Sequence, residues 1–121
     1  MSELDELAYK EAASTYRLLS HPGRLQILDE LRRGEACVCH LQMLLDRPQA
    51  YVSQQLRVLR EAGVLGTDKD GLNVYYRIVS QPVFDLLEVL LGPRQVVRII
   101  RDCPCPKCAS GNCSTSDAAV A

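Results

Sequence analysis

The sequence predicts a mainly α-helical fold that carries one small β-hairpin. Most of the chain repeats apolar residues at helical spacing, and proline or glycine separates the successive runs. Two of the predicted helices are short and are joined by the tight link 46–48, in the proportions of a helix-turn-helix. After Gly63 the apolar spacing changes to that of strands around an aspartate-glycine turn at 68–71. This order predicts a winged helix-turn-helix, with the hairpin as the wing.

The first two helices are predicted from their spacing and from the residues that end them. Apolar residues recur over 4–19, so this stretch is expected to be an amphipathic helix. Pro22 starts the second helix, because proline disfavours helix in the residue before it and suits the first helical position. Arg32 and Arg33 lie in its last turn, and Gly34 is the expected C-terminal cap.

The third and fourth helices make up the helix-turn-helix. The third is expected to turn Leu41, Leu44 and Leu45 towards the core. Pro48 is expected to open the fourth helix and Gly63 to close it. The predicted inward residues of the fourth helix are Val52, Leu56 and Leu59.

The wing is expected to consist of strands at 64–67 and 74–78, and a further helix starts near Pro82. Leu86 and Leu90 repeat on this helix after the compact domain is complete. Their position predicts a helix–helix interface, so the chain is expected to form a homodimer through its terminal helices.

Composition divides the 121 residues into one domain and a tail. The length suits a single domain, so residues 1–101 are predicted to form the winged helix-turn-helix and dimerisation domain, ending in a helix at 94–101. Residues 102–121 are rich in Pro, Ser, Gly, Asn and Ala, which predicts a flexible tail.

The start of the chain and its cysteines point to the cytoplasm. The N-terminal residues lack the order of a secretory signal, and no apolar run approaches the about 20 residues of a membrane helix. Thiols stay reduced in the cytosol, so the six cysteines are expected to be metal ligands or redox sensors rather than structural disulfides. No enzyme is predicted, because the chain lacks a Gly-rich phosphate loop and any acid-base constellation beyond His21 and His40.

The outer face of the fourth helix is the candidate DNA-contacting surface. Its polar side chains can bond base edges and phosphates, although a solvated surface helix would have a similar composition. Residues 47–77 hold five Arg and Lys against three Asp and Glu, a local charge of +2, although the whole chain carries −1. The candidates are Gln49, Ala50, Ser53, Gln54, Gln55 and Arg57 on the helix and Lys69 and Arg77 on the wing.

Cys37 and Cys39 form a pair, here called the CxC pair, before the helix-turn-helix. Grouped thiolates bind soft metal ions, close disulfides or sense oxidants. Residues two apart in a regular helix point about 200° apart, so an intact helix cannot direct both thiolates to one ion. Either the pair lies at a helix start with extended backbone, or ion binding unwinds the first turn. The alternative is that the two cysteines are not ligands but small buried apolar residues, as free cysteines often are.

The tail holds four more cysteines within eleven residues, far more than its composition would place there by chance. Their spacings of two, three and five residues let several thiolates converge on one ion. A separate four-cysteine zinc knot is therefore an alternative to a site shared with the CxC pair. The tail cysteines are Cys103, Cys105, Cys108 and Cys113.

Four segments within residues 10–92 resemble the ArsR/SmtB family of dimeric winged-helix repressors. The segment LLSHPGRLQILDEL is similar to the family's opening signature, and ACVCHL is similar to its metal-binding box, ELCVCDL. The segment YVSQQLRVLREAGVL is similar to its recognition helix, and DGLNVYYRI is similar to its wing. The resemblance implies a transcriptional repressor that leaves a palindromic double-stranded operator when a metal or metalloid ion binds. A two-fold dimer would place its recognition helices about 34 Å apart on that operator. Where the family usually has histidine this chain has Gln55, so the family's operator preference does not carry over.

By the same resemblance, the CxC pair binds the ion that releases DNA. Arsenite is the first candidate because it prefers three thiolates, with Cd(II), Pb(II) or Zn(II) as alternatives. The third cysteine of arsenic-responsive members is absent at Gln42, and residues 81–101 lack the histidines of the family's late-helix site. Further ligands are expected from His40 or from the tail of the same or the partner subunit. The predicted ligands are Cys37, Cys39, Cys103, Cys105 and Cys108.

Two other functions fit the same fold. A thiol redox or persulfide sensor would bond a tail cysteine covalently to Cys37 or Cys39, and stoichiometric metal binding under reductant would argue against it. A metal-storage or chaperone module would not bind DNA. A gel shift with the upstream region of its own gene would distinguish such a module from a repressor.

Overall fold

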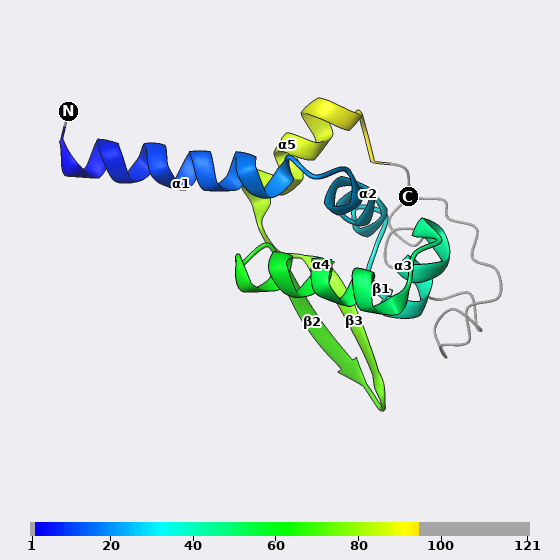
Figure 1. Cartoon of the computed structure of the whole chain (residues 1–121). Helices are drawn as coiled ribbons and strands as arrows, with labels where there is room; N and C mark the ends of the chain where they lie inside the picture. Colours follow the sequence, from blue (N-terminus) through cyan, green and yellow to red (C-terminus); the bar gives the residue numbers. More distant parts are fainter. Residues whose placement is uncertain (1, 95–121) are drawn as a thin grey trace.

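The computed structural model describes residues 2–94 and confirms a mainly helical fold with a small antiparallel sheet. Helices α3 and α4 form the helix-turn-helix, and strands β2 and β3 form the wing. The expected helix beyond Arg94 and the whole tail, with its four cysteines, lie outside the described residues. Among residues 2–94, every helix is too short or too polar to span a lipid bilayer. In chain order the elements are α1 (Glu3–Leu19), α2 (Pro22–Leu31), β1 (Ala36–Cys37), α3 (Val38–Leu45), α4 (Gln49–Glu61), β2 (Leu65–Asp70), β3 (Asn73–Ile78) and α5 (Gln81–Leu91) (Figure 1).

The helices begin at the predicted signals. Pro22 occupies the first position of α2, and Nδ1 of His21 accepts hydrogen bonds from the backbone N–H groups of Gly23 (3.1 Å) and Arg24 (3.4 Å). The link between α3 and α4 contains Asp46 with a φ of 52°, a left-handed conformation that aspartate tolerates better than most residues. The cap at the start of α2 and the link before α4 each involve residues close together in the sequence. Together with helical spacing, such local features are sufficient to place α2 and α4.

The wing is longer than predicted. Asp70 pairs directly with Asn73, so the turn consists only of Gly71 and Leu72. The expected turn at 68–71 is therefore wrong by three residues at its start and by one at its end. Gly71 has a φ of 65°, as the first position of a two-residue type II′ turn requires. The strands therefore continue the hairpin further from the core than their apolar residues indicate.

A third strand, β1, is not predicted from the sequence. The sheet order is β1-β3-β2, and β1 pairs antiparallel with β3 through Ala36 opposite Tyr76 and Cys37 opposite Tyr75. This pairing attaches the first residue of the CxC pair to the wing.

The core lies among helices α2, α3, α4 and α5 and the base of the wing. The predicted inward residues of α4, Val52, Leu56 and Leu59, have no exposed surface. On α3 Leu41 is buried, but Leu44 is 52% exposed, so the prediction that Leu44 faces the core is wrong. The 8 residues of α3 make just over two turns, and only a narrow face of so short a helix reaches the core.

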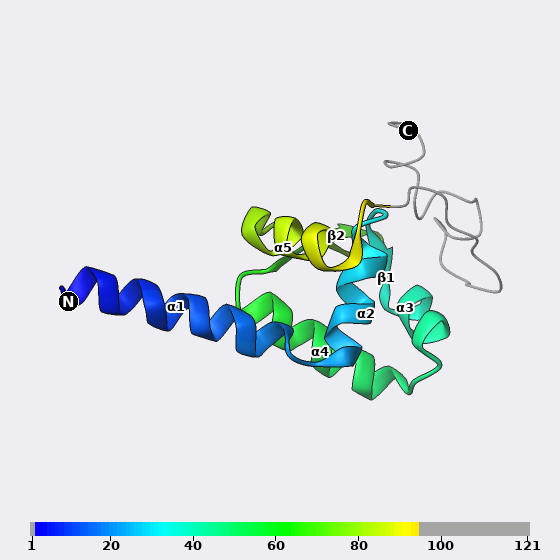
Figure 2. The ribbon, with the colours of Figure 1, turned by 90° about the horizontal axis from the view of Figure 1, so that it is seen from above.

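Helix α1 projects away from the rest of the subunit in both views (Figures 1 and 2). Only Leu19 of its 17 residues is buried, and residues 3–14 are all exposed. Leu86 of α5 packs partly against the core of its own subunit, whereas Leu90 is exposed. Exposed apolar surface of this kind is typical of a protein–protein interface. On α1 and the end of α5 it consists of Leu4, Leu7, Tyr9, Tyr16, Val89, Leu90 and Leu91.

Candidate DNA-binding surface and thiol site

The outer face of α4 is exposed along the helix. Its 13 residues span about 20 Å, and a helix of this kind fits the major groove of B-DNA. The exposure predicted from helical spacing is confirmed for Gln49, Ala50, Ser53, Gln54 and Arg57.

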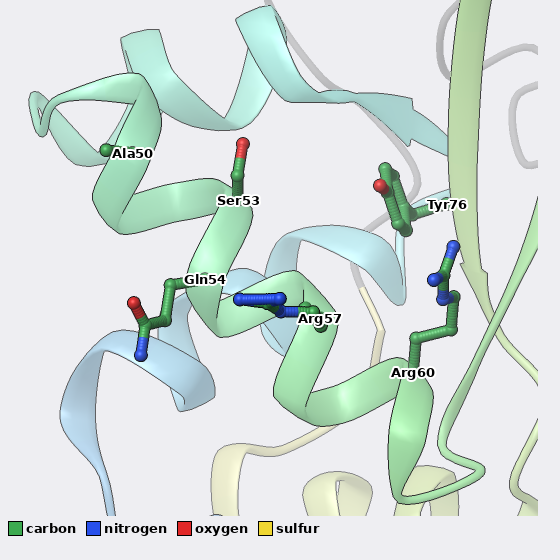
Figure 3. Close-up of a pocket in the computed structure, with 6 residues that line it drawn as sticks. All are labelled: Ala50, Ser53, Gln54, Arg57, Arg60 and Tyr76. Carbon is green, nitrogen blue, oxygen red and sulfur yellow. The ribbon is translucent and has the colours of Figure 1, made fainter.

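A shallow hollow of about 320 Å³ lies between α4 and the wing; we call it the α4–wing hollow. Arg57 and Arg60 line it from α4 and the Tyr76 ring lines it from β3, together with Ala50, Ser53 and Gln54 (Figure 3). Arg60 and Tyr76 are not among the DNA-contacting residues predicted from the sequence. Arg60 follows Arg57 by three residues, a spacing that places both on one face of a helix. Tyr76 has no such signal, because its position depends on the strand pairing.

The two wing candidates do not line this hollow. Arg77 forms an ion pair with Asp68 across the hairpin, and it lines a second hollow that also contains Glu35 and Arg94. Lys69 is exposed on β2 near the wing tip. Exposed ion pairs are worth only about 0–1 kcal/mol, so the Asp68 carboxylate does not prevent Arg77 from contacting a phosphate.

Gln55 is predicted to contact DNA, and the structure contradicts this prediction. Its side chain is only 8% exposed. Its Oε1 accepts a hydrogen bond from Nε of Arg24 (2.9 Å), and Nη1 of the same arginine donates to the Leu18 carbonyl oxygen (3.2 Å). One guanidinium therefore joins the end of α1, the start of α2 and the middle of α4. Arg24 is a positioning residue for the exposed face of α4.

Replacing Arg24 with alanine is expected to lower the free energy of unfolding by about 1–3 kcal/mol, because the buried Gln55 oxygen loses its donor. Urea unfolding followed by circular dichroism measures this change. Lys10→Ala is the matched control, since Lys10 is an exposed cation on α1 and surface exchanges usually stay within about 0.5 kcal/mol. Equal stability of the two variants would show that the Arg24 bonds do not hold α4.

The CxC pair adopts the first of the two predicted arrangements. Cys37 precedes the first turn of α3 with extended backbone (φ −89°, ψ 169°), and Cys39 is the second residue of the helix. The two Sγ atoms are 2.9 Å apart and are not joined by a disulfide. Cys37 is 4% exposed and Cys39 is partly exposed. The extended residue thus brings together two thiols that a continuous helix would separate.

This pair fits part of a soft-ion site. Both donors are thiols, and their separation lets them bind one ion after a small side-chain rotation. Within residues 2–94, however, no three His, Cys, Asp or Glu side chains are arranged to hold a metal ion. The Nε2 atom of His40 lies 2.8 Å from Oε2 of Glu30, with both residues 5% exposed, so this contact ties α3 to α2. The described residues therefore provide an incomplete site of two thiolates.

The fold, the exposed face of α4 and the wing define a winged helix-turn-helix DNA-binding protein. Residues 21–66 match the family of bacterial regulatory proteins called the arsR family. A biofilm growth-associated repressor of Agrobacterium fabrum is 39% identical over 80 residues, which are 66% of this chain and 68% of that protein. The chain belongs to the ArsR/SmtB family of transcriptional regulators.

Two solved structures are similar to the chain. The AntR antimony-specific transcriptional repressor has a TM-score of 0.64 and 32% identity, over 69% of this chain and 76% of that one. A homodimeric winged helix-turn-helix DNA-binding domain of Mycobacterium bovis has a TM-score of 0.67 and 26% identity, over 75% of this chain and 84% of that one. These relatives are regulators, in agreement with the prediction that the chain is not an enzyme.

Proposed function

We propose that the protein is a dimeric repressor that leaves its operator when a thiophilic metal or metalloid ion binds the CxC pair. The position of the pair carries this proposal. Strand β1 joins Cys37 to the wing, and α3 joins Cys39 to the link that leads into α4. An ion held by both thiolates is therefore attached to both elements that would face DNA. As a DNA-binding regulator, the protein would act in the cytoplasm.

Helix α4 is the proposed recognition helix in the major groove. The amide of Gln54 can bond an adenine edge, and the guanidinium of Arg57 can bond guanine or a phosphate. The α4–wing hollow lies beside these side chains and carries a second arginine, Arg60, which suits a phosphate. The remaining proposed contacts are Gln49, Ala50, Ser53, Tyr76, Lys69 and Arg77.

The dimer is proposed to form through α1 and α5. Residues 3–14 of α1 are exposed, and the apolar side chains of an amphipathic helix that projects from its subunit need a partner to bury them. The similar domain of Mycobacterium bovis is homodimeric, which supports the same assembly here. Two-fold symmetry would then place two α4 helices on a palindromic operator.

The tail is proposed to complete the ion site. Arg94 lines a hollow together with Glu35, which precedes Cys37 by two residues. Cys103 follows Arg94 by nine residues, and nine residues span at most about 30 Å. A tail cysteine of the same subunit is therefore within reach of the CxC pair. Cys103, Cys105 and Cys108 are the proposed further ligands.

The effect of the ion on DNA follows from linkage. An inducer must bind more tightly to the DNA-free form, so the site has to differ between the two forms. Cys37 pairs with Tyr75, and the next residue, Tyr76, lines the α4–wing hollow. Drawing Cys37 towards an ion shifts β1 against β3 and changes the surface that α4 and the wing present together.

Arsenite is the first proposed inducer, because two thiolates plus one tail thiol supply the three that it prefers. The similarity to an antimony-specific repressor supports a metalloid as the inducer. Cd(II), Pb(II) and Zn(II) are the alternatives, since they also bind thiolates.

The decisive experiment is a parallel titration of DNA release. A labelled operator from the upstream region is followed by fluorescence anisotropy under a reductant without thiols, with arsenite, antimonite, Cd(II), Pb(II) and Zn(II). Release at the lowest concentration by the two metalloids supports the proposal. If none of the five ions releases the DNA, the proposal that the protein senses an ion is contradicted. If only Cd(II) releases the DNA, the inducer is Cd(II) and not arsenite.

Replacing Gln54 or Arg57 with alanine is expected to weaken operator binding by about 1–3 kcal/mol, because each exchange removes a base or phosphate contact. Anisotropy measures the affinity and sedimentation confirms the dimer. Met43→Ala is the control, because Met43 is 43% exposed on α3 and belongs neither to the proposed DNA-contacting surface nor to the proposed dimer interface. Normal affinity in both α4 variants would place the DNA-reading surface elsewhere.

A further inference from the structure

We infer that the CxC pair is also a redox-modification site, which closes into a Cys37–Cys39 disulfide when the oxidant is a small-molecule disulfide. The two Sγ atoms are 2.9 Å apart, and a disulfide bond measures about 2.05 Å. The sulfur atoms therefore need to approach by about 0.9 Å, which side-chain rotation can supply. This inference does not depend on which ion the protein senses.

The backbone around the pair explains why these two residues can react with each other. In a continuous helix the side chains would point about 200° apart. Here Cys37 is extended and held in β1 by pairing with Tyr75, and the helix begins only at Val38. The change from strand to helix between the two cysteines turns both side chains to the same side.

Exposure sets the order of the reaction. Cys39 is partly exposed, whereas Cys37 is 4% exposed. The Cys39 thiolate attacks one sulfur of the small disulfide, the bond between its sulfurs breaks, and the first small thiolate leaves and takes up a proton. The Cys37 thiolate then attacks the Cys39 sulfur of the mixed disulfide and displaces the second small thiol. Two electrons pass from the cysteine pair to the oxidant, and two small thiols are formed for each protein disulfide.

Closure of the pair has a consequence for sensing, which rests on the proposed function. A disulfide has no thiolate to offer, so the oxidised protein loses both ligands that the described residues provide. An oxidant would then block the response to the ion, and reduction of the disulfide would restore it. The chemistry of the pair and its use in sensing can be tested separately.

The test isolates the pair from the tail. A full-length variant with serine at the four tail cysteines is oxidised with glutathione disulfide, alkylated and digested with trypsin. Trypsin cleaves after Arg33 and Arg57 but not before Pro48, so the peptide 34–57 holds the CxC pair without another cysteine. We expect mass spectrometry to show that this peptide has lost two hydrogen atoms and carries no alkyl group.

Two matched variants check the order of attack. In Cys37→Ser the reaction should stop at a glutathione adduct on Cys39, whereas in Cys39→Ser the buried Cys37 should react more slowly. Circular dichroism verifies that both variants are folded. If both cysteines of peptide 34–57 are still alkylated after treatment with glutathione disulfide, or if they carry only glutathione adducts, the inference is overturned. In the natural protein, a link from peptide 34–57 to a tail peptide in place of the internal bond would also overturn it.

Discussion

Glutamate at both Leu7 and Leu90 is expected to convert the dimer to monomers and to weaken operator binding by about 10²–10⁴-fold. Leu7 on α1 is 52% exposed and Leu90 on α5 is 66% exposed, so neither side chain supports the core of its own subunit. Two carboxylates per chain would have to be buried in the proposed interface without partners. A monomer binds half of a palindrome, so it loses the gain of about 10²–10⁴-fold that linked binding sites provide. Sedimentation velocity measures the assembly, and anisotropy measures the affinity.

Leu44→Glu is the matched control for this experiment. Leu44 is also 52% exposed, but it lies on α3, away from α1 and α5. This variant should remain a dimer. Leu86→Glu is less informative, because Leu86 packs partly against its own core and its exchange would also destabilise the fold. Dimers in the Leu7/Leu90 variant would exclude both helices as the main interface.

Local signals explain how much of the fold the sequence predicts. Pro22 and its capping neighbour His21 place the start of α2, and Gly63 with a φ of 80° lies at the end of α4. Helical spacing also identifies the buried and exposed faces of α4, since its 13 residues make more than three turns. These features depend on residues within one turn of each other, so they can be predicted without knowing the tertiary structure.

Contacts between distant residues explain what the sequence does not predict. The two residues of β1 have no strand pattern of their own, and they are ordered by pairing with residues about 40 positions later in the chain. Gln55 lies next to exposed Gln54, but its burial follows from a bond to Arg24, which is 31 residues away. The α4–wing hollow depends on Tyr76, whose orientation is fixed by the same sheet.

The candidate thiol site combines both kinds of information. Two cysteines separated by one residue can be recognised as a ligand pair from spacing alone. Whether both thiols can meet depends on where the helix starts, and spacing leaves two arrangements open. The pairing of Cys37 with Tyr75 decides between them, because it keeps Cys37 extended. The same strand pairing connects the CxC pair to the wing, in addition to its connection to α4 through α3.

Cys37→Ser is expected to raise the arsenite concentration needed for DNA release by more than about 100-fold. Serine is similar in size to cysteine but lacks a soft thiolate, so the proposed site loses one of three ligands. Loss of an outer-shell partner alone typically costs about 10–100-fold in metal affinity, and a direct ligand should cost more. Operator affinity without an ion should stay close to that of the natural protein, since Cys37 is 4% exposed and does not belong to the proposed DNA-contacting surface. Anisotropy of a labelled operator, titrated with arsenite under a reductant without thiols, gives both quantities.

Deleting residues 103–121 tests the other half of the proposed site. The described residues supply only the two thiolates of the CxC pair, so the truncated protein should respond to arsenite much more weakly while binding the operator normally. Cys113→Ser is the control, because it makes the same exchange in the tail outside the proposed ligands Cys103, Cys105 and Cys108. A truncated protein that releases DNA at the natural arsenite concentration would show that the tail is not part of the sensing site. A weakened response in both Cys37→Ser and the truncation, with unchanged ion-free affinity, is the result expected of one ion site built from the CxC pair and the tail.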